Sequence, residues 1–163
     1  MRPARPPWQR LLRDPVHCLA FGFGAGCSPL APGTAGSLLG LALFLMLPPL
    51  PWPWLLGLLA AVLAFGVWVC GASARRLGVH DHPGIVLDEI AGMWIVAASL
   101  PRQPGWLLAG FIAFRLFDIF KPWPIRDVDH SVRGGLGIML DDVIAAVYAA
   151  LLLAAGRQLL TAW

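Results

Sequence analysis

Residues 54–71 read Trp-Leu-Leu-Gly-Leu-Leu-Ala-Ala-Val-Leu-Ala-Phe-Gly-Val-Trp-Val-Cys-Gly, eighteen residues without a charged side chain. A helix needs about 20 such residues to cross the hydrocarbon core of a bilayer. The whole chain has the same character, with a mean hydropathy of +0.72. Of its 163 residues, 58% are hydrophobic against the usual ~45–50%, and 13% are charged against the usual ~25%. The sequence therefore predicts an all-α integral membrane protein.

Four further apolar segments are shorter or carry charges: 37–47, 85–100, 106–120 and 138–155. Stretches rich in proline and glycine separate them, as is typical of helix ends. We expect one domain over residues 1–163, in which a basic segment at 1–16 and a Gly/Pro-rich loop precede a compact bundle of about five apolar helices. Several segments are shorter than a full span, so either they extend into flanking polar residues or some pack inside the bundle.

Basic residues orient this bundle, because cytoplasmic loops of membrane proteins carry an excess of Lys and Arg. With the N-terminus inside, nine of the twelve Lys and Arg residues fall on the cytoplasmic side: Arg2, Arg5, Arg10, Arg13, Arg75, Arg76, Lys121, Arg126 and Arg133. The net charge of +3 is spread over dispersed arginines and one lysine. This pattern favours anionic lipids as partners and argues against nucleic acid.

Five carboxylates lie just inside the ends of apolar segments, where an ionisable side chain costs about 2.5–3.5 kcal/mol or more. They are Asp88, Glu89, Asp118, Asp141 and Asp142. In the orientation set by the basic residues alone, all five come to the cytoplasmic ends of their helices. Like charges held together need a cation or must hold protons, and oxygen ligands suit Mg²⁺. The acids therefore predict a cation site at this end of the bundle.

Basic side chains occur at the same depth. Arg115, Asp118 and Lys121 are spaced i, i+3, i+6 and so share one stripe of a helix. Lys121 leads into a stiff Pro-Trp-Pro-Ile loop that ends at Arg126, and arginine's planar fork matches phosphate oxygens. Acids and bases together indicate a metal-bridged phosphoester site. A simpler interpretation, in which Arg115 and Asp118 only satisfy one another, stays open.

Two other motifs each allow two interpretations, and the cysteines allow one. Pro32-Gly-Thr34 either starts a helix whose amides bind phosphate or forms a closely packed re-entrant loop. His80-Asp-His82 either binds metal or forms a polar turn before Pro83. The three cysteines lack C-x-x-C spacing, which argues against disulfides and a thiolate zinc site, so we expect them to be packing residues.

Six stretches in order carry a family resemblance: Gly22-Phe-Gly-Ala-Gly, Ala31-Pro-Gly-Thr-Ala-Gly-Ser, Val79-His-Asp-His, Ile85-Val-Leu-Asp-Glu-Ile-Ala-Gly-Met-Trp-Ile, Phe114-Arg-Leu-Phe-Asp-Ile-Phe-Lys-Pro-Trp-Pro-Ile-Arg and Gly134-Gly-Leu-Gly-Ile-Met-Leu-Asp-Asp. Together they resemble phosphatidylglycerophosphatase A, a family of bacterial inner-membrane lipid phosphatases. The resemblance runs from about Asp14 to beyond Tyr148, nearly the whole chain. Pro83 and Asp127 depart from the family's pattern.

The resemblance implies Mg²⁺-dependent hydrolysis of the terminal phosphomonoester of phosphatidylglycerol phosphate, at the cytoplasmic side of the inner membrane. It places the acidic motif positions on the five carboxylates and the basic ones on Arg115, Lys121 and Arg126. We expect these metal ligands: Asp88, Glu89, Asp141 and Asp142. We expect Asp118, Asp88 and Asp142 to be catalytic, with Asp118 either a further ligand or the base that orients water. The expected phosphate-binding residues are Lys121, Arg126, Arg115 and Thr34. Attack by water and a covalent aspartyl-phosphate both stay open.

Two other classes of function are considered. Buried acids also relay cations in ion- or proton-coupled transporters, and a lipid-phosphate-binding subunit without catalysis would need the same charges. Five short helices are few for a carrier unless it forms a homo-oligomer. Acids gathered at one end also fit a surface site better than a path across the membrane.

Overall fold

The computed structural model describes residues 13–161, and every regular element in that range is helical. The elements are α2 (Pro15–Ala20), η1 (Gly22–Cys27, a 3₁₀ turn), α3 (Pro32–Met46), α4 (Trp52–Leu77), α5 (Leu87–Ser99), α6 (Pro104–Phe120), α7 (Ile125–Ser131) and α8 (Gly134–Thr161). The prediction of an all-α chain is confirmed. Most of the expected basic segment at 1–16 lies outside the described residues.

Each of the five expected apolar segments contains a helix, but their lengths differ from the expectation. Within residues 13–161, only α4 and α8 are long and apolar enough to cross a membrane. The other three have 15, 13 and 17 residues (α3, α5 and α6), below the ~20 of a full span. A count of about five membrane-crossing helices is therefore not confirmed.

The helix ends follow from proline and glycine. Helices α3, α4 and α6 each have a proline in their first two positions, where its missing N–H costs nothing. Helix α4 ends at Gly78, whose φ of +68° closes the last turn. Helix α6 ends at Lys121, which adopts a left-handed φ of +42° before Pro122. The chain turns there into α7, which was not expected within the predicted breaker region.

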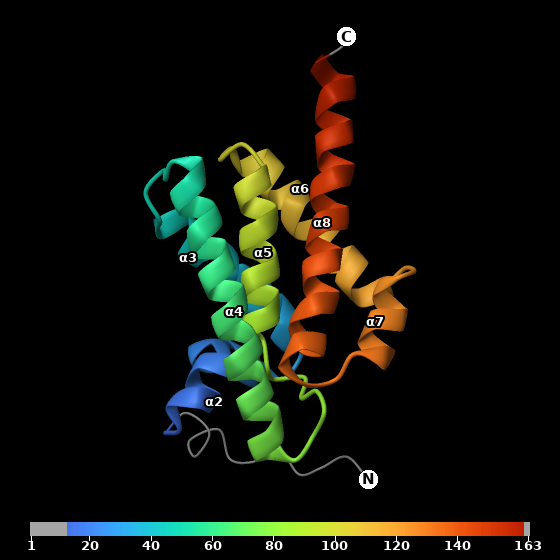
Figure 1. The fold of residues 1–163 in the computed structure, drawn as a ribbon. Coiled ribbons are helices and arrows are strands. Elements are labelled where there is room, and N and C mark those ends of the chain that lie inside the picture. The colour runs from blue at the N-terminus through green and yellow to red at the C-terminus, as the bar shows by residue number, and fades with distance from the viewer. Residues whose placement is uncertain (1–12, 162–163) are drawn as a thin grey trace.

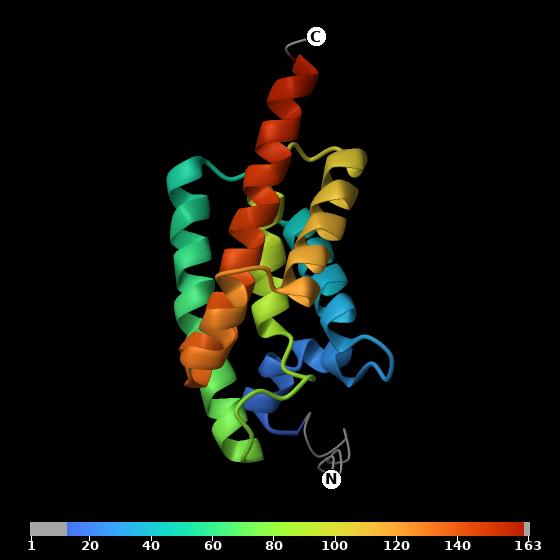
Figure 2. The ribbon, with the colours of Figure 1, turned by 90° about the vertical axis from the view of Figure 1, so that its right-hand side faces the viewer.

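The longer helices α3, α4, α5, α6 and α8 run side by side along one direction (Figures 1 and 2). Helix α2 lies at the end of the bundle where α5 and α8 begin, and α7 lies beside the first half of α8. The last turns of α8 extend beyond the other helices at the opposite end. The starts of α5 and α8 and the end of α6 therefore meet in one region of the bundle.

Small residues let the helix backbones approach closely. A Cβ on Gly135 of α8 would lie 1.8 Å from the carbonyl oxygen of Val67 in α4, and one on Gly40 of α3 would lie 2.9 Å from the backbone of Ile90 in α5. Neither position can accept a side chain without separating the helices. These contacts fix α8 against α4 and α3 against α5.

Two apolar clusters form the core. One joins α2 to α4 and to the first turns of α5 and α8, and the other joins α3 and α6 to the later turns of α5 and α8. Along α8, Met139 belongs to the first cluster and Ala145 to the second, so Asp141 and Asp142 lie between them.

The outside of the bundle is apolar as well. Trp54, Trp68, Leu151 and Leu152 are each more than half exposed, and contiguous exposed apolar surface marks contact with lipid or protein. A groove of about 540 Å³ opens between α6 and α8. Its lining is Ala109, Ile112, Ala113, Leu116, Phe117, Phe120, Pro122 and Leu152. An all-apolar outer groove suits a protein that is surrounded by lipid.

Candidate active site

Three helices bring the five predicted acids together. Asp88 and Glu89 begin α5, Asp118 lies in the last turn of α6, and Asp141 and Asp142 lie in the second and third turns of α8. Oxygen atoms of Asp88, Glu89 and Asp142 lie within 4.8 Å of one another, and so do those of Asp118, Asp141 and Asp142. The convergence expected from the basic residues is thus present in the structure.

Local structure explains why Asp88 and Glu89 are tolerated at the start of α5. Both lie in the first turn of the helix, where the unpaired N–H groups favour negative charge. One turn later, a Cβ on Gly92 would lie 2.6 Å from the Phe114 ring and 3.3 Å from the carbonyl oxygen of Asp142. Because Gly92 carries no side chain, α5 approaches α6 and α8 closely enough for their acids to meet.

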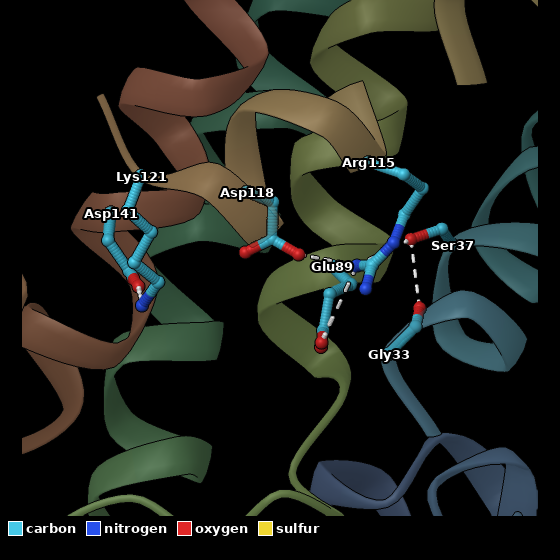
Figure 3. Close-up of polar contacts among 7 residues, drawn as sticks. All are labelled: Gly33, Ser37, Glu89, Arg115, Asp118, Lys121 and Asp141. Carbon is cyan, nitrogen blue, oxygen red and sulfur yellow. Dashed lines mark hydrogen bonds and ion pairs between the residues drawn. The ribbon is translucent and has the colours of Figure 1, made fainter. Parts of the chain in front are cut away.

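Asp118 has the opposite position, at the C-terminal end of α6, where the helix dipole disfavours a carboxylate. Arg115, one turn earlier, compensates for this. Its Nη1 lies 2.6 Å from Asp118 Oδ2 and 3.9 Å from Glu89 Oε1 (Figure 3). The guanidinium therefore links α6 to α5. Both interpretations of the Arg115–Asp118 spacing stay open, because this contact pairs the two residues inside the acid cluster itself.

Helix α3 closes the other side of Arg115. The fully buried Ser37 hydroxyl donates to the Gly33 carbonyl oxygen at 2.9 Å and accepts from Arg115 Nη1 at 3.4 Å (Figure 3). A Cβ on Gly33 would lie 2.3 Å from Glu89 Oε1. The start of α3, at Gly33 and Ser37, thus packs against Arg115 and Glu89 and holds them in place.

Lys121 joins three helices at the opposite edge of the cluster. Its Nζ lies 2.6 Å from Asp141 Oδ2 and 3.0 Å from Asp129 Oδ1 of α7. Burial alone would lower the pKa of Lys121, but hydrogen bonds and charge interactions with Asp141 and Asp129 outweigh it and raise that pKa. Lys121 is therefore a cation at neutral pH, and one of its three N–H donors is left for another partner.

Several carboxylate oxygens in the cluster are buried without a hydrogen-bond partner among the described residues. They are Asp88 Oδ1, Glu89 Oε2, Asp141 Oδ1 and Asp142 Oδ2. Leaving a buried charged oxygen unpaired is costly. Hard cations such as Mg²⁺ take oxygen ligands of this kind. The donor set therefore fits a metal ion, and it contains the four acids that the sequence predicts as metal ligands.

Other predicted residues are not brought into this cluster. Arg126 is exposed on α7, and within residues 13–161 its side chain has no ion pair with the acids. Thr34 follows Gly33 in the first turn of α3. His82 accepts a hydrogen bond from the Gly84 amide at 3.0 Å, as expected of a polar turn. Among the described residues, neither carboxylate group that can hold a metal includes a histidine.

Sequence reasoning missed two contributors. Ser37 lies one turn after Gly33, so its i, i+4 spacing in a glycine-rich helix start could have marked it. Asp129 belongs to α7, whose seven residues follow two prolines, and no pattern within so short a segment indicates that it pairs with Lys121. Two of the three cysteines match the prediction of packing residues, since Cys70 is buried in the first apolar cluster and Cys27 packs against that cluster.

Comparison with known proteins agrees with this geometry. The family model for phosphatidylglycerophosphatase A matches residues 18–157. Phosphatidylglycerophosphatase A of Escherichia coli K12 is 45% identical over 140 residues, covering 85% of this chain and 81% of that protein. The Haemophilus influenzae protein of the same name is 46% identical over 145 residues, covering 85% and 86%.

A third relative carries a different name. The putative phosphatidylinositol-3-phosphatase of Bacteroides thetaiotaomicron is 39% identical over 144 residues, covering 83% of this chain and 89% of that protein. No solved structure matches the chain. The family model and the two named phosphatases cover most of the sequence, and the residues 18–157 matched by the family model span all five acids of the cluster. The chain therefore belongs to the phosphatidylglycerophosphatase A family of lipid phosphatases.

Proposed function

We propose that this protein hydrolyses the terminal phosphomonoester of phosphatidylglycerol phosphate in a Mg²⁺-dependent reaction that yields phosphatidylglycerol and phosphate. The observation that carries the proposal is the buried cluster of five carboxylates, flanked by Arg115 and Lys121 and located where α5 and α8 begin. The names of the two bacterial relatives support the choice of substrate.

In this proposal Asp88, Glu89, Asp141 and Asp142 hold the metal. A bound divalent cation supplies positive charge for the phosphoryl oxygens and lowers the pKa of water. The residues around it bind and orient the phosphate. Lys121 has one N–H donor beyond its bonds to Asp141 and Asp129, and Arg126 and Thr34 lie in the first turns of α7 and α3.

Asp118 has two roles open to it. As a base, its carboxylate accepts a proton from the water that attacks phosphorus in line. As a ligand, it completes the oxygen set beside Asp141 and Asp142, whose oxygens lie within 4.8 Å of its own. Arg115 holds the Asp118 carboxylate in one position in either case. A covalent aspartyl-phosphate is the alternative to direct attack by water.

The proposed setting is the inner membrane of a bacterium, with the acid cluster at the cytoplasmic side. The two long apolar helices and the exposed tryptophans support a membrane protein. Basic residues are in excess in the loops at the end of the bundle that carries the acid cluster, and this excess supports the orientation. Anionic lipids and a homo-oligomer are further proposed partners.

The test is phosphate release from phosphatidylglycerol phosphate by the detergent-purified protein, with and without Mg²⁺. Asp142→Asn is compared with Asp127→Asn, which makes the same charge change on the exposed face of α7. We expect release that needs both Mg²⁺ and Asp142 and that Asp127→Asn leaves intact. Phosphatidylinositol 3-phosphate is assayed beside it, because of the name of the third relative.

Absence of release from a folded, Mg²⁺-loaded sample would contradict the proposal. A cation- or proton-coupled transporter would then be detected as flux across sealed vesicles. A non-catalytic lipid-phosphate-binding subunit would bind the lipid without either activity. Faster release from phosphatidylinositol 3-phosphate would reassign the substrate while leaving the lipid phosphatase in place.

A further inference from the structure

The five carboxylates form two groups of three that share one member. Asp88 and Glu89 of α5 meet Asp142 on one side, and Asp118 and Asp141 meet the same Asp142 on the other. In each group, one oxygen from each residue lies within 4.8 Å of the other two. Oxygen ligands about 2.0–2.1 Å from an octahedral Mg²⁺ lie about 3–4 Å apart. Each group is therefore the size of a single-ion site.

The unpaired oxygens are distributed over both groups. Among the members of the first group, Asp88 has an unpaired Oδ1 and Glu89 an unpaired Oε2. In the second group Asp141 has an unpaired Oδ1, and Asp142, which belongs to both groups, has an unpaired Oδ2. Asp142 is only 2% exposed and Asp88 8%, so water does not replace the missing partners from bulk solvent. One ion in either group would leave unpaired oxygens in the other. Satisfying both groups takes two ions.

The balance of charge leads to the same number. Six carboxylates, the five of the cluster and Asp129, face two basic side chains, Arg115 and Lys121, so the ionised site has four negative charges in excess. One divalent cation leaves an excess of two, and a phosphomonoester with a charge of about −1.5 to −2 would then enter a site that is still negative. Two divalent cations cancel the excess, so the site no longer repels the substrate.

We propose that the cluster holds two divalent cations, one in each group of three carboxylates, with the carboxylate of Asp142 shared between them. The inference rests on the proposed function for its purpose, because paired ions about 3.5–4 Å apart are suited to phosphoester hydrolysis. Its geometry stands on the described residues alone. Asp142 can serve both ions because α8 packs against both α5 and α6, and the absence of a side chain at Gly92 brings the α5 backbone against α8.

Binding of Mn²⁺ tests the proposal, because Mn²⁺ accepts the same carboxylate and water ligands as Mg²⁺ and is visible by electron paramagnetic resonance. The full chain is purified in detergent, stripped with a chelator and titrated. We expect two Mn²⁺ per chain at saturation, with a spin-coupled signal. Asp88→Asn and Asp118→Asn should each retain one ion and lose the coupling. Asp127→Asn should retain both ions and the coupling.

Asp142→Asn should lose the coupled signal and bind at most one ion. If that variant does not fold, the wild-type stoichiometry and the Asp88→Asn and Asp118→Asn pair still decide the question. A single uncoupled Mn²⁺ in the wild type would overturn the proposal, as would complete loss of binding in both single-group variants.

The result is separable from the proposed function, since binding is measured without turnover. Two coupled ions without phosphate release would preserve this site and remove the proposed reaction. Phosphate release with a single bound ion would preserve the reaction and remove the second ion.

Discussion

At the scale of single residues, Asp142 is the least solvent-exposed of the five acids and has the most carboxylate neighbours. It is 2% exposed and belongs to both groups of three. Without a cation its charge is repelled by four other acids, and in the proposed metal-bound state it is a ligand. Its contribution to stability should therefore change sign with metal.

We predict that Asp142→Asn raises the melting temperature in the presence of a chelator, because it removes one buried like charge. A shift of about 2–4 °C corresponds to 1 kcal/mol in a domain of this size. In saturating Mg²⁺ the wild type should melt at the higher temperature. Thermal unfolding in detergent with and without chelator measures both. A variant that is less stable than the wild type under both conditions would contradict this account of the cluster.

Gly33 is the second residue with a specific requirement. Alanine there would place a Cβ 2.3 Å from Glu89 Oε1 and 2.9 Å from Arg115 Nη2. We predict that Gly33→Ala costs about 1–3 kcal/mol of unfolding free energy, as overpacking does, and lowers phosphate release. Gly57→Ala is the matched control, since nothing lies within 4 Å of its Cβ position, and it should be neutral or stabilising. Equal effects of the two substitutions would mean that helix propensity alone is being measured.

At the scale of helices, Lys121 connects α6 to α7 and α8 through Asp129 and Asp141. Removing it leaves the Asp141 carboxylate, 9% exposed, without its cation. We predict that Lys121→Gln lowers the free energy of unfolding by about 1–3 kcal/mol, less than for a fully buried pair because Lys121 is partly exposed. Chemical denaturation measures this. Arg126→Gln on the exposed face of α7 should stay within about 0.5 kcal/mol of wild type.

Helix α2 is fixed to α4 by polar contacts of a different kind. Asp14 pairs with Arg76 at 2.6 Å, and His17 Nδ1 lies 2.8 Å from the buried hydroxyl of Ser73. Burial lowers the pKa of His17, an effect that the Asp14 charge opposes and the Arg76 charge reinforces. The folded state therefore binds fewer protons at this site than the unfolded state, so this site favours folding at neutral pH and opposes it as the pH falls below about 6.5.

We predict that His17→Gln loses less stability than the wild type when the pH is lowered from 7.5 to 5.5. His130→Gln, on the exposed face of α7, should lose as much as the wild type. The comparison cancels the titration of the acid cluster, which all three proteins share. Melting temperatures at the two pH values give the answer, and equal losses in all three would exclude a role for His17.

Much of the helix arrangement was predictable from the sequence. Apolar runs bounded by proline and glycine located all five long helices, because apolarity and helix breakers act locally. Helix α7 was not predictable, because its seven residues are held by Ile125 in the core and by the Lys121–Asp129 ion pair. The meeting of the acids was predictable, since it follows from helix direction alone. The packing of Gly33 and Ser37 against Arg115 and Glu89 was not predictable, since it depends on how closely α3 approaches α5 and α6.

At the scale of the whole molecule, the proposed orientation puts the acid cluster and α7 on the cytoplasmic side. The turn between α5 and α6 then lies on the other side. Asp127 in α7 and Gln103 before α6 are both exposed. In a chain with its three cysteines replaced by alanine, we predict that a cysteine at 127 reacts with an impermeant maleimide only in inside-out vesicles. A cysteine at 103 should react in right-side-out vesicles. The reverse pattern would invert the topology.

The membrane assignment itself was only partly predictable. The composition indicates a lipid environment, but α3, α5 and α6 are too short to span it separately. Helices α5 and α6 pack against α8, and α5 also packs against α4; α4 and α8 are the two helices with the length of a span. The length of an apolar segment can be counted in the sequence. Whether the helix spans the bilayer also depends on how neighbouring helices cover its surface.

Helix α8 is the last to be synthesised, and it supplies a carboxylate to each of the two groups of three. While the chain is still on the ribosome, α5 and α6 have already delivered Asp88, Glu89 and Asp118, with Arg115 as their counter-charge. Asp141 and Asp142 follow only after the turn at Gly134. In the proposed two-ion site, the oxygen set would therefore be complete only once α8 has been added, and a chain that stops before Gly134 would lack two of the five carboxylates.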